Sequence, residues 1–250
     1  AASSGIQWLS LQKTIGPITV QQLGLQFADG KIAFLLQASM SVGPLSISLD
    51  GLGVRTALSP IEPTFFLNGM GLEFKSGPLE IGGAFLRNPS PPPNTAFEYD
   101  GAALIRFKSF SLAALGSYAQ MTNGQPSLFL YAVLNYPIGG PAFFFVTGLA
   151  AGFGYNRSLR VPAIEQVSTF PLVEAVMNGT AVGASNATAL SGELAKLSPW
   201  LPPSEGDYFL AVGIKFNSFK IIDSFAMLSM SFGNRFELNI LGLSNLVIPT

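Results

Sequence analysis

The chain has 250 residues and a net charge of −1, with 48% hydrophobic but only 11% charged residues. A soluble domain typically carries about 25% charged residues, so this chain has little ionic surface. Its near-neutral charge excludes the basic stripe of a nucleic-acid-binding protein and a polybasic signal for anionic lipid. Because Cys and His are absent, disulfides, Cys or His metal sites and His-activated nucleophiles are excluded too. We expect no metal and no cofactor.

The first third of the chain alternates apolar and polar residues with the period of two that a half-buried strand requires. This pattern predicts strands over residues 6–14, 18–28, 31–42, 44–54, 65–74 and 78–87. Asp29-Gly30 predicts a two-residue hairpin, since a type I′ turn needs positive φ at both central positions. A unit of turn, Gly-Pro and alternating strand recurs at Pro17, Pro44, Pro78 and Pro141.

Residues 88–95 form a stiff Pro-rich linker, NPSPPPNT. The alternation resumes directly after it, so we interpret it as a loop within a single β domain rather than as a domain boundary. Further strands are predicted over 96–108, 110–121, 127–136 and 141–155.

The pattern changes in residues 156–204, which we interpret as a partly helical insertion. Helical spacing occurs over 170–178 and 188–197, and Thr188 is a plausible N-cap of the second segment. Strands return over 208–217, 220–232 and 235–247. The last two are apolar on both faces, so we expect both of their sides to be covered.

The glycine-rich run from Gly148 to Gly154 resembles a nucleotide loop only superficially, because it lacks the Walker and dinucleotide spacings. Glycines within a strand usually mark close backbone approach or a bend. The uncharged run 138–155 approaches the length of a membrane span, but its Pro, Gly and Phe content favours a strand. Two carboxylates could form a glycosidase pair; the candidates are Glu73, Glu80, Glu98, Asp100, Asp207, Asp223 and Glu237.

Three glycosylation sequons begin at Asn156, Asn178 and Asn186, although such a Ser/Thr-rich chain would hold about two by chance. The chain also has 21 Phe residues. Together with the other apolar strand residues, they provide more apolar surface than a small β-sandwich needs to bury. We expect an assembly or packing surface that includes Phe143, Phe144, Phe145, Phe225, Phe232 and Phe236.

Several stretches resemble an uncharacterised family, a domain of unknown function from very long β-rich proteins of bacteria and fungi. The most specific is FFFVTGLAAGFGYNR, and the others include LQKTIGPITVQQLGLQF, GLEFKSGPLEIGGAFLR and FNSFKIIDSFAMLSMSFGNRFELNILGLSNLVIPT. The resemblance covers nearly the whole chain and implies a piece of a longer protein. It implies no activity, cofactor or catalytic residue.

We therefore predict an all-β fold, an antiparallel meander of about twelve long strands forming a barrel-like or strongly curved sheet. The predicted function is a non-enzymatic structural module that self-associates or packs within a larger β protein, since few charged gatekeepers oppose edge pairing. An extracellular or cell-surface location is favoured. Two alternatives stay open: a membrane-inserted or lipid-binding β-barrel, whose aromatic girdles are not evident from 2 Trp and 6 Tyr, and a carbohydrate-active enzyme.

Overall fold

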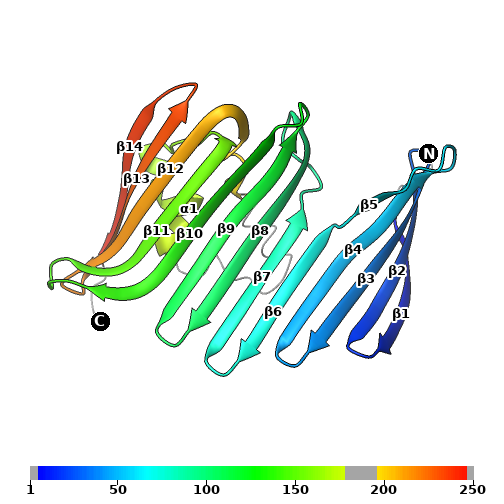
Figure 1. Cartoon of the computed structure of the whole chain (residues 1–250). Helices are drawn as coiled ribbons and strands as arrows, with labels where there is room; N and C mark the ends of the chain where they lie inside the picture. Colours follow the sequence, from blue (N-terminus) through cyan, green and yellow to red (C-terminus); the bar gives the residue numbers. More distant parts are fainter. Residues whose placement is uncertain (1–4, 178–195, 247–250) are drawn as a thin grey trace.

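The computed structural model describes residues 5–177 and 196–246, and these form one all-β sheet of fourteen antiparallel strands (Figure 1). Thirteen strands are hydrogen-bonded in chain order, and β5 lies off this path beside β4. The predicted meander is confirmed, with two strands more than expected. Of the two predicted forms, barrel-like or strongly curved, the described sheet has the second, because it is strongly curved and does not close into a barrel.

The N-terminal strands are β1 (Gln7–Ile15), β2 (Ile18–Ala28), β3 (Lys31–Val42), β4 (Leu45–Ala57), β5 (Thr64–Phe66), β6 (Gly69–Ser76) and β7 (Leu79–Arg87). The remaining strands are β8 (Thr95–Phe107), β9 (Phe110–Met121), β10 (Pro126–Gly139), β11 (Phe145–Arg157), β12 (Pro203–Ser218), β13 (Ile222–Gly233) and β14 (Glu237–Leu246). The 3₁₀ helix η1 (Ile164–Thr169) and the helix α1 (Pro171–Met177) lie between β11 and β12.

The two ends of the sheet differ in their connections. At the short-turn end, β1–β2, β3–β4 and β6–β7 are joined by Gly-Pro pairs, with positive φ at Gly16, Gly43 and Gly77. Glycine adopts this conformation without a Cβ clash, which allows two-residue hairpins. The opposite, long-loop end carries residues 88–94, and β11 ends and β12 begins there. The predicted Asp29-Gly30 hairpin also lies there, and both of its residues have positive φ.

Side chains alternate between two faces of the sheet, which we call inner and outer. The cross-strand partners Ser117, Phe129, Gly154 and Phe209 lie on the inner face, and so does Glu98. The neighbouring residues of each strand point to the outer face. Strands β9–β14 curve around η1 and α1, so that α1 contacts β10 and β13 and η1 contacts β14 on the inner face (Figure 1).

The hydrophobic core lies between the inner face and this segment. Phe170, Leu172, Val173 and Val176 are fully buried there against residues of the sheet, which include Leu115, Phe129, Tyr131, Val133, Phe209, Ala211, Phe225 and Met227. The outer face of the last strands is not covered, since Leu228 and Ile240 are exposed among the residues described. Nothing in the described part of the chain covers the outer side of β13 and β14, so the expectation that both of their sides are covered stays a prediction.

The glycines of β11 give the core room for aromatic rings. A Cβ at Gly152 would lie 2.7 Å from the ring of Tyr131, and a Cβ at Gly154 would overlap the ring of Phe209. Close approach rather than phosphate binding therefore explains the run from Gly148 to Gly154, which lies in the middle of a strand.

Of the predicted helical segments, 170–178 is confirmed as α1, which begins one residue later, while Asn178 lies outside the described residues. The segment 188–197, with its proposed cap Thr188, lies almost entirely outside the described residues. No helix in the described part of the chain is long and apolar enough to cross a membrane.

Candidate functional site

A buried ion pair joins β8 to the end of β11. Arg157 Nη2 donates to Glu98 Oε1 at 2.7 Å and to Ser117 Oγ at 2.9 Å, and the Ser117 hydroxyl donates to the same carboxylate at 2.8 Å. Asn88 Nδ2 donates to the other oxygen, Glu98 Oε2. The second guanidinium nitrogen, Arg157 Nη1, donates to the carbonyl oxygen of Leu201 at 2.7 Å. The pair therefore fastens the end of the 158–202 segment to the sheet.

Asp100 lies two residues beyond Glu98 on the same face of β8. Burial, and secondly the charge of Glu98, raise the pKa of the Asp100 carboxyl to about 6, while Ser117 and Arg157 oppose the shift. Of the carboxylates considered for an acid–base pair, these two are brought together on one strand. Because Arg157, Ser117 and Asn88 bond the oxygens of Glu98, we assign the cluster a fastening role.

Two further inner-face side chains hold α1. The hydroxyl of Tyr131 donates to the carbonyl oxygen of Leu172 at 3.0 Å. Lys215 Nζ donates to the carbonyl oxygens of Val176 and Met177, at 3.0 and 3.2 Å, near the C-terminal end of the helix. A cation there complements the helix dipole and satisfies terminal carbonyl groups. The inner face of β9–β14 is thus occupied by the protein's own segment.

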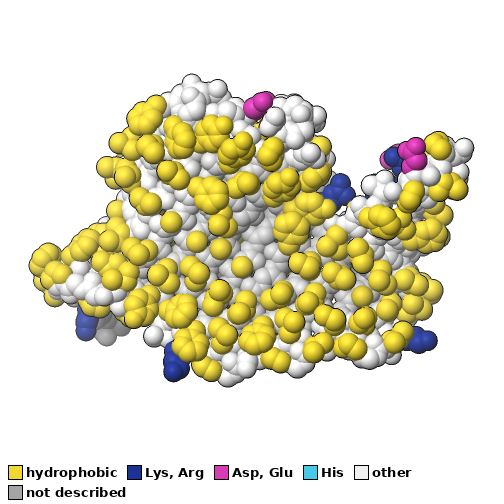
Figure 2. Space-filling model, viewed as in Figure 1, with side chains coloured by type: hydrophobic (Ala, Val, Ile, Leu, Met, Phe, Trp, Pro, Cys, Tyr) yellow, Lys and Arg dark blue, Asp and Glu magenta, His cyan; other side chains and the backbone are white. Residues whose placement is uncertain are grey.

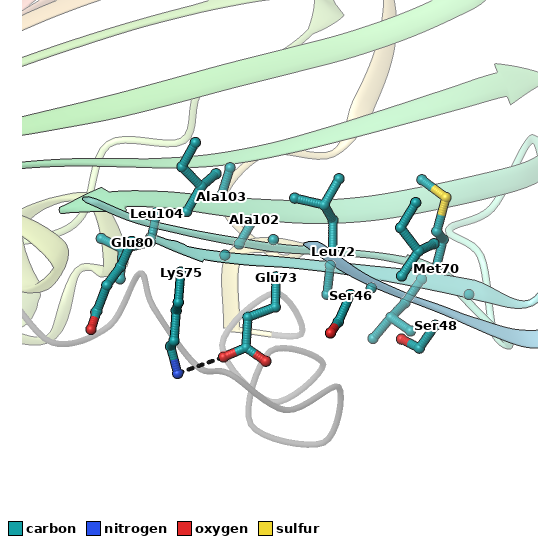
Figure 3. A pocket seen from close by; sticks show the side chains of 18 of the residues that line it. Ser46, Ser48, Met70, Leu72, Glu73, Lys75, Glu80, Ala102, Ala103 and Leu104 are labelled. Atoms are coloured by element: carbon teal, nitrogen blue, oxygen red, sulfur yellow. Dashed lines mark ion pairs between the residues drawn. The ribbon is translucent and has the colours of Figure 1, made fainter. Parts of the chain in front are cut away.

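The inner face of β4, β6, β7 and β8 forms an open trough of about 390 Å³ (Figure 3). Ser46, Glu73 and Lys75 lie on its side of the strands, while Met70 and Leu72 project from the opposite side. Glu73 pairs with Lys75 at 2.6 Å, and both side chains are more than half exposed. Such exposed pairs contribute little stability. The trough therefore combines charged groups that reach water with apolar inner-face side chains, which include Ala84, Leu86, Ala102 and Leu104.

The outer face has almost no charge. By the ladder register, the charged strand residues on the inner face include Asp50, Arg55, Glu73, Lys75, Glu80, Glu98, Asp100, Arg106, Lys215 and Asp223. The start of β12, residues 203–206, is irregular and is left aside here. Among the other described strand residues, only Lys13 and Arg87 are charged and lie on the outer face. Lys13 is on the edge strand β1, and Arg87 is the last residue of β7.

This uncharged outer face is apolar and exposed. The strand β3 shows the contrast, since the outer side chain of Phe34 is 55% exposed and that of its inner neighbour Leu35 is 3% exposed. The exposed outer residues run from one edge to the other and include Leu9, Leu23, Leu25, Leu52, Met70, Leu72, Leu130, Leu149, Leu210, Val212, Leu228 and Ile240. In Figure 2 apolar side chains spread over the visible face, and charged groups gather at its borders. Monomeric proteins rarely expose so large an apolar patch without a partner.

Aromatic residues form two rows across the outer face. Towards the long-loop end, the rings of Phe85, Tyr99, Phe97 and Tyr118 contact in sequence, as do those of Tyr155, Tyr208 and Phe232. Towards the short-turn end, Phe107 contacts Phe110, and Phe144 contacts Phe216. The strand β12 contributes Tyr208 to one row and Phe216 to the other.

The predicted Phe surface divides between core and exterior. Phe225 is 1% exposed and belongs to the core. Phe232 lies in the outer aromatic row, and Phe236 is 69% exposed in the turn before β14. Phe143, Phe144 and Phe145 are exposed at the short-turn end. The six residues therefore do not form one surface.

Of the three predicted sequons, only Asn156 lies within the described residues. Its side chain is buried, its Nδ2 donates to the carbonyl oxygen of Pro126, and its Oδ1 accepts from the N–H of Gly206. A glycan on Asn156 would have to replace these hydrogen bonds. Asn178 and Asn186 lie outside the described residues.

The sorting of charge by face was missed from the sequence, although β8 carries the signal. Glu98, Asp100 and Arg106 have even numbers, whereas Phe97, Tyr99, Ile105 and Phe107 have odd ones. Extending this comparison to every predicted strand would have revealed an uncharged face. The two aromatic rows were missed because the sequence was searched for girdles of Trp and Tyr, whereas many of the rings in these rows belong to Phe.

The chain belongs to the family of unknown function DUF6603, whose model matches residues 11–250. This finding confirms the resemblance to an uncharacterised family. No curated protein matches the chain, and no solved structure does. Arguments about function therefore rest on the geometry of the sheet itself.

Proposed function

We propose that this member of the family lies against lipid, with its outer face in contact with hydrocarbon and the charged residues of its inner face turned towards water. The observation that carries the proposal is the sorting of charge. The outer face is uncharged between its aromatic rows, and the strands place nearly all of their Asp, Glu, Lys and Arg residues on the inner face. Charged side chains in hydrocarbon are costly, whereas a face lying against water has no need to exclude them.

The spacing of the aromatic rows supports this proposal. Tyr208 and Phe216 are eight residues apart on β12, which corresponds to about 26 Å along an extended strand. The apolar band of membrane-spanning sheets is about 25 Å high and is flanked by aromatic residues at both interfaces; with the usual strand tilt of about 35–45°, the segment between Tyr208 and Phe216 would span about 20 Å of that height. The amphipathic ring of Tyr suits the boundary between hydrocarbon and headgroups.

The shape of the sheet favours lipid over a second copy as the partner of this face. The sheet curves around its inner-face core, so the outer face of β9–β14 is convex. Two rigid convex faces touch along a narrow zone and would leave most exposed Leu and Phe side chains in water. Fluid acyl chains adapt to the curvature and cover the whole face.

A fluorescence experiment tests the lipid contact, and the cysteine-free chain makes single labelling simple. Val212 lies midway between Tyr208 and Phe216 on the outer face, and Ser48 is an exposed inner-face control in the trough. Val212→Cys and Ser48→Cys, each labelled with nitrobenzoxadiazole, are mixed with phosphatidylcholine vesicles. We expect a blue shift at position 212 and quenching by nitroxide-labelled acyl chains, with neither effect at position 48.

A probe at position 212 that stays in water when vesicles are present would overturn the proposal. A blue shift that needs no vesicles and grows with protein concentration would overturn it as well, because another copy would then cover the face.

A matched charge pair gives a second readout. Val212→Arg should reduce flotation of the protein with vesicles by at least about tenfold, given a cost of about 2–4 kcal/mol for Arg at the bilayer centre, whereas Ser48→Arg should leave flotation unchanged.

A further inference from the structure

The two edge strands of the sheet have free backbone hydrogen-bonding groups. Each has a single strand neighbour, since β1 pairs only with β2 and β14 only with β13 in the described sheet. All nine residues of β1 are exposed, and Ile240 of β14 is 78% exposed. Unprotected strand edges are templates for pairing with another strand.

In contact with hydrocarbon, unpaired edge strands are energetically unfavourable, because no water is present to bond their N–H and C=O groups. The inference therefore rests on the proposed lipid contact. A sheet with its outer face in a bilayer needs a strand beside β1 and a strand beside β14. The expected self-association of the chain offers both strands at once.

Strand direction restricts how two copies can join. Thirteen antiparallel strands lie on the path from β1 to β14, and because thirteen is odd, the two edge strands run in the same direction. Both begin at the long-loop end. Copies that face the membrane in the same sense can join β14 to β1 only as parallel neighbours. Two-fold pairing of β14 with a second β14 would put the long-loop ends of the two copies on opposite sides of the membrane.

The side chains of the two edge strands are compatible with this parallel pairing of β14 with β1, which we call the seam. On the outer face β1 offers Leu9 and Ile15, and β14 offers Leu238 and Ile240, so the apolar surface would continue across the join. Each strand has one charged residue. Lys13 lies near the short-turn end of β1 and Glu237 at the long-loop end of β14, so no like charges oppose each other.

We infer that β14 of one copy pairs in parallel with β1 of a second copy, extending the sheet from copy to copy. The contact uses different surfaces on its two sides, so each copy keeps a free β1 or β14 for the next. Repetition of such a contact by rotation about the membrane normal closes into a ring. The inner faces, with their charged residues, would then line the inside of that assembly.

Crosslinking between single-cysteine copies tests the seam. Leu9→Cys and Ile240→Cys both lie on the outer face and near the long-loop end of their strands. The two variants are mixed in phosphatidylcholine vesicles and treated with a short bismaleimide. We expect crosslinked dimers in the mixture at a yield several-fold above that of either variant alone. Ile15→Cys, at the opposite end of β1, is the matched control and should crosslink poorly to Ile240→Cys.

The other outcomes separate the seam from the lipid contact. Dimers from Ile240→Cys alone indicate two-fold pairing and overturn the seam, as does efficient crosslinking of Ile15→Cys to Ile240→Cys. A crosslink within one chain of the Leu9→Cys/Ile240→Cys double variant overturns it too. Lack of any crosslink while the probe at position 212 reports lipid overturns the seam and leaves the lipid contact standing. Crosslinks in the mixture with that probe in water support the seam and overturn the lipid contact.

Discussion

Arg157 and Glu98 are 59 residues apart in sequence, yet their side chains meet at 2.7 Å with less than 4% of either exposed. Removing one partner of such a pair leaves a buried charge without compensation. We expect Arg157→Met to reduce the free energy of unfolding by about 3–5 kcal/mol. Urea denaturation followed by circular dichroism measures the loss.

The double variant Glu98→Gln/Arg157→Met provides the control for this prediction. It removes both charges together, so no uncompensated carboxylate stays buried, and it should be more stable than Arg157→Met alone. If the double variant loses as much free energy of unfolding as Glu98→Gln and Arg157→Met lose together when made singly, the two residues act independently and the fastening role is wrong.

Asp100 should make stability depend on pH. Its carboxyl has a pKa raised to about 6 in the folded chain, mainly by burial, against an ordinary value of 3.8. The folded state therefore binds this proton more tightly than the unfolded state does. The contribution of Asp100 to the free energy of unfolding accordingly becomes more favourable as the pH falls from above 6 towards 4. Asp100→Asn should be more stable than the unchanged chain at pH 7, and this advantage should shrink at pH 5. Melting temperatures of the two proteins at both pH values measure it, and an advantage equal at both would contradict the assignment.

The sequence predicted the strands well because their alternation and turn residues are local signals. Asp29-Gly30 and the Gly-Pro pairs specify hairpins within a few residues, so the meander followed directly. The choice between a barrel-like and an open, strongly curved sheet stayed open, because closure depends on curvature and on which edges meet, and strands as distant as β1 and β14 leave no local signal. The cluster around Glu98 was missed for the same reason, since Asn88, Ser117 and Arg157 come from separate segments.

Two buried serines should respond oppositely to removal of the hydroxyl. Ser117 Oγ bonds both Glu98 and Arg157, whereas Ser229 Oγ has no partner among the protein groups described, although it lies opposite Asn239. Leaving charged partners unsatisfied costs about 1–3 kcal/mol, while deleting an unbonded buried hydroxyl is neutral or stabilising. We expect Ser117→Ala to lower the urea midpoint and Ser229→Ala to leave it unchanged or raise it. A clear loss in Ser229→Ala would show that its hydroxyl is satisfied in solution.

The six phenylalanines predicted as one surface should also separate in stability. Phe225 packs in the core between β13 and the buried segment, so Phe225→Ala removes contacts that the core cannot easily refill and should cost about 3–5 kcal/mol. Phe236 is exposed in a turn, so Phe236→Ala should stay within about 0.5 kcal/mol of the unchanged chain. Both variants are compared by urea denaturation in detergent-free buffer. A substantial loss from Phe236→Ala that grows with protein concentration would place Phe236 in a contact between copies.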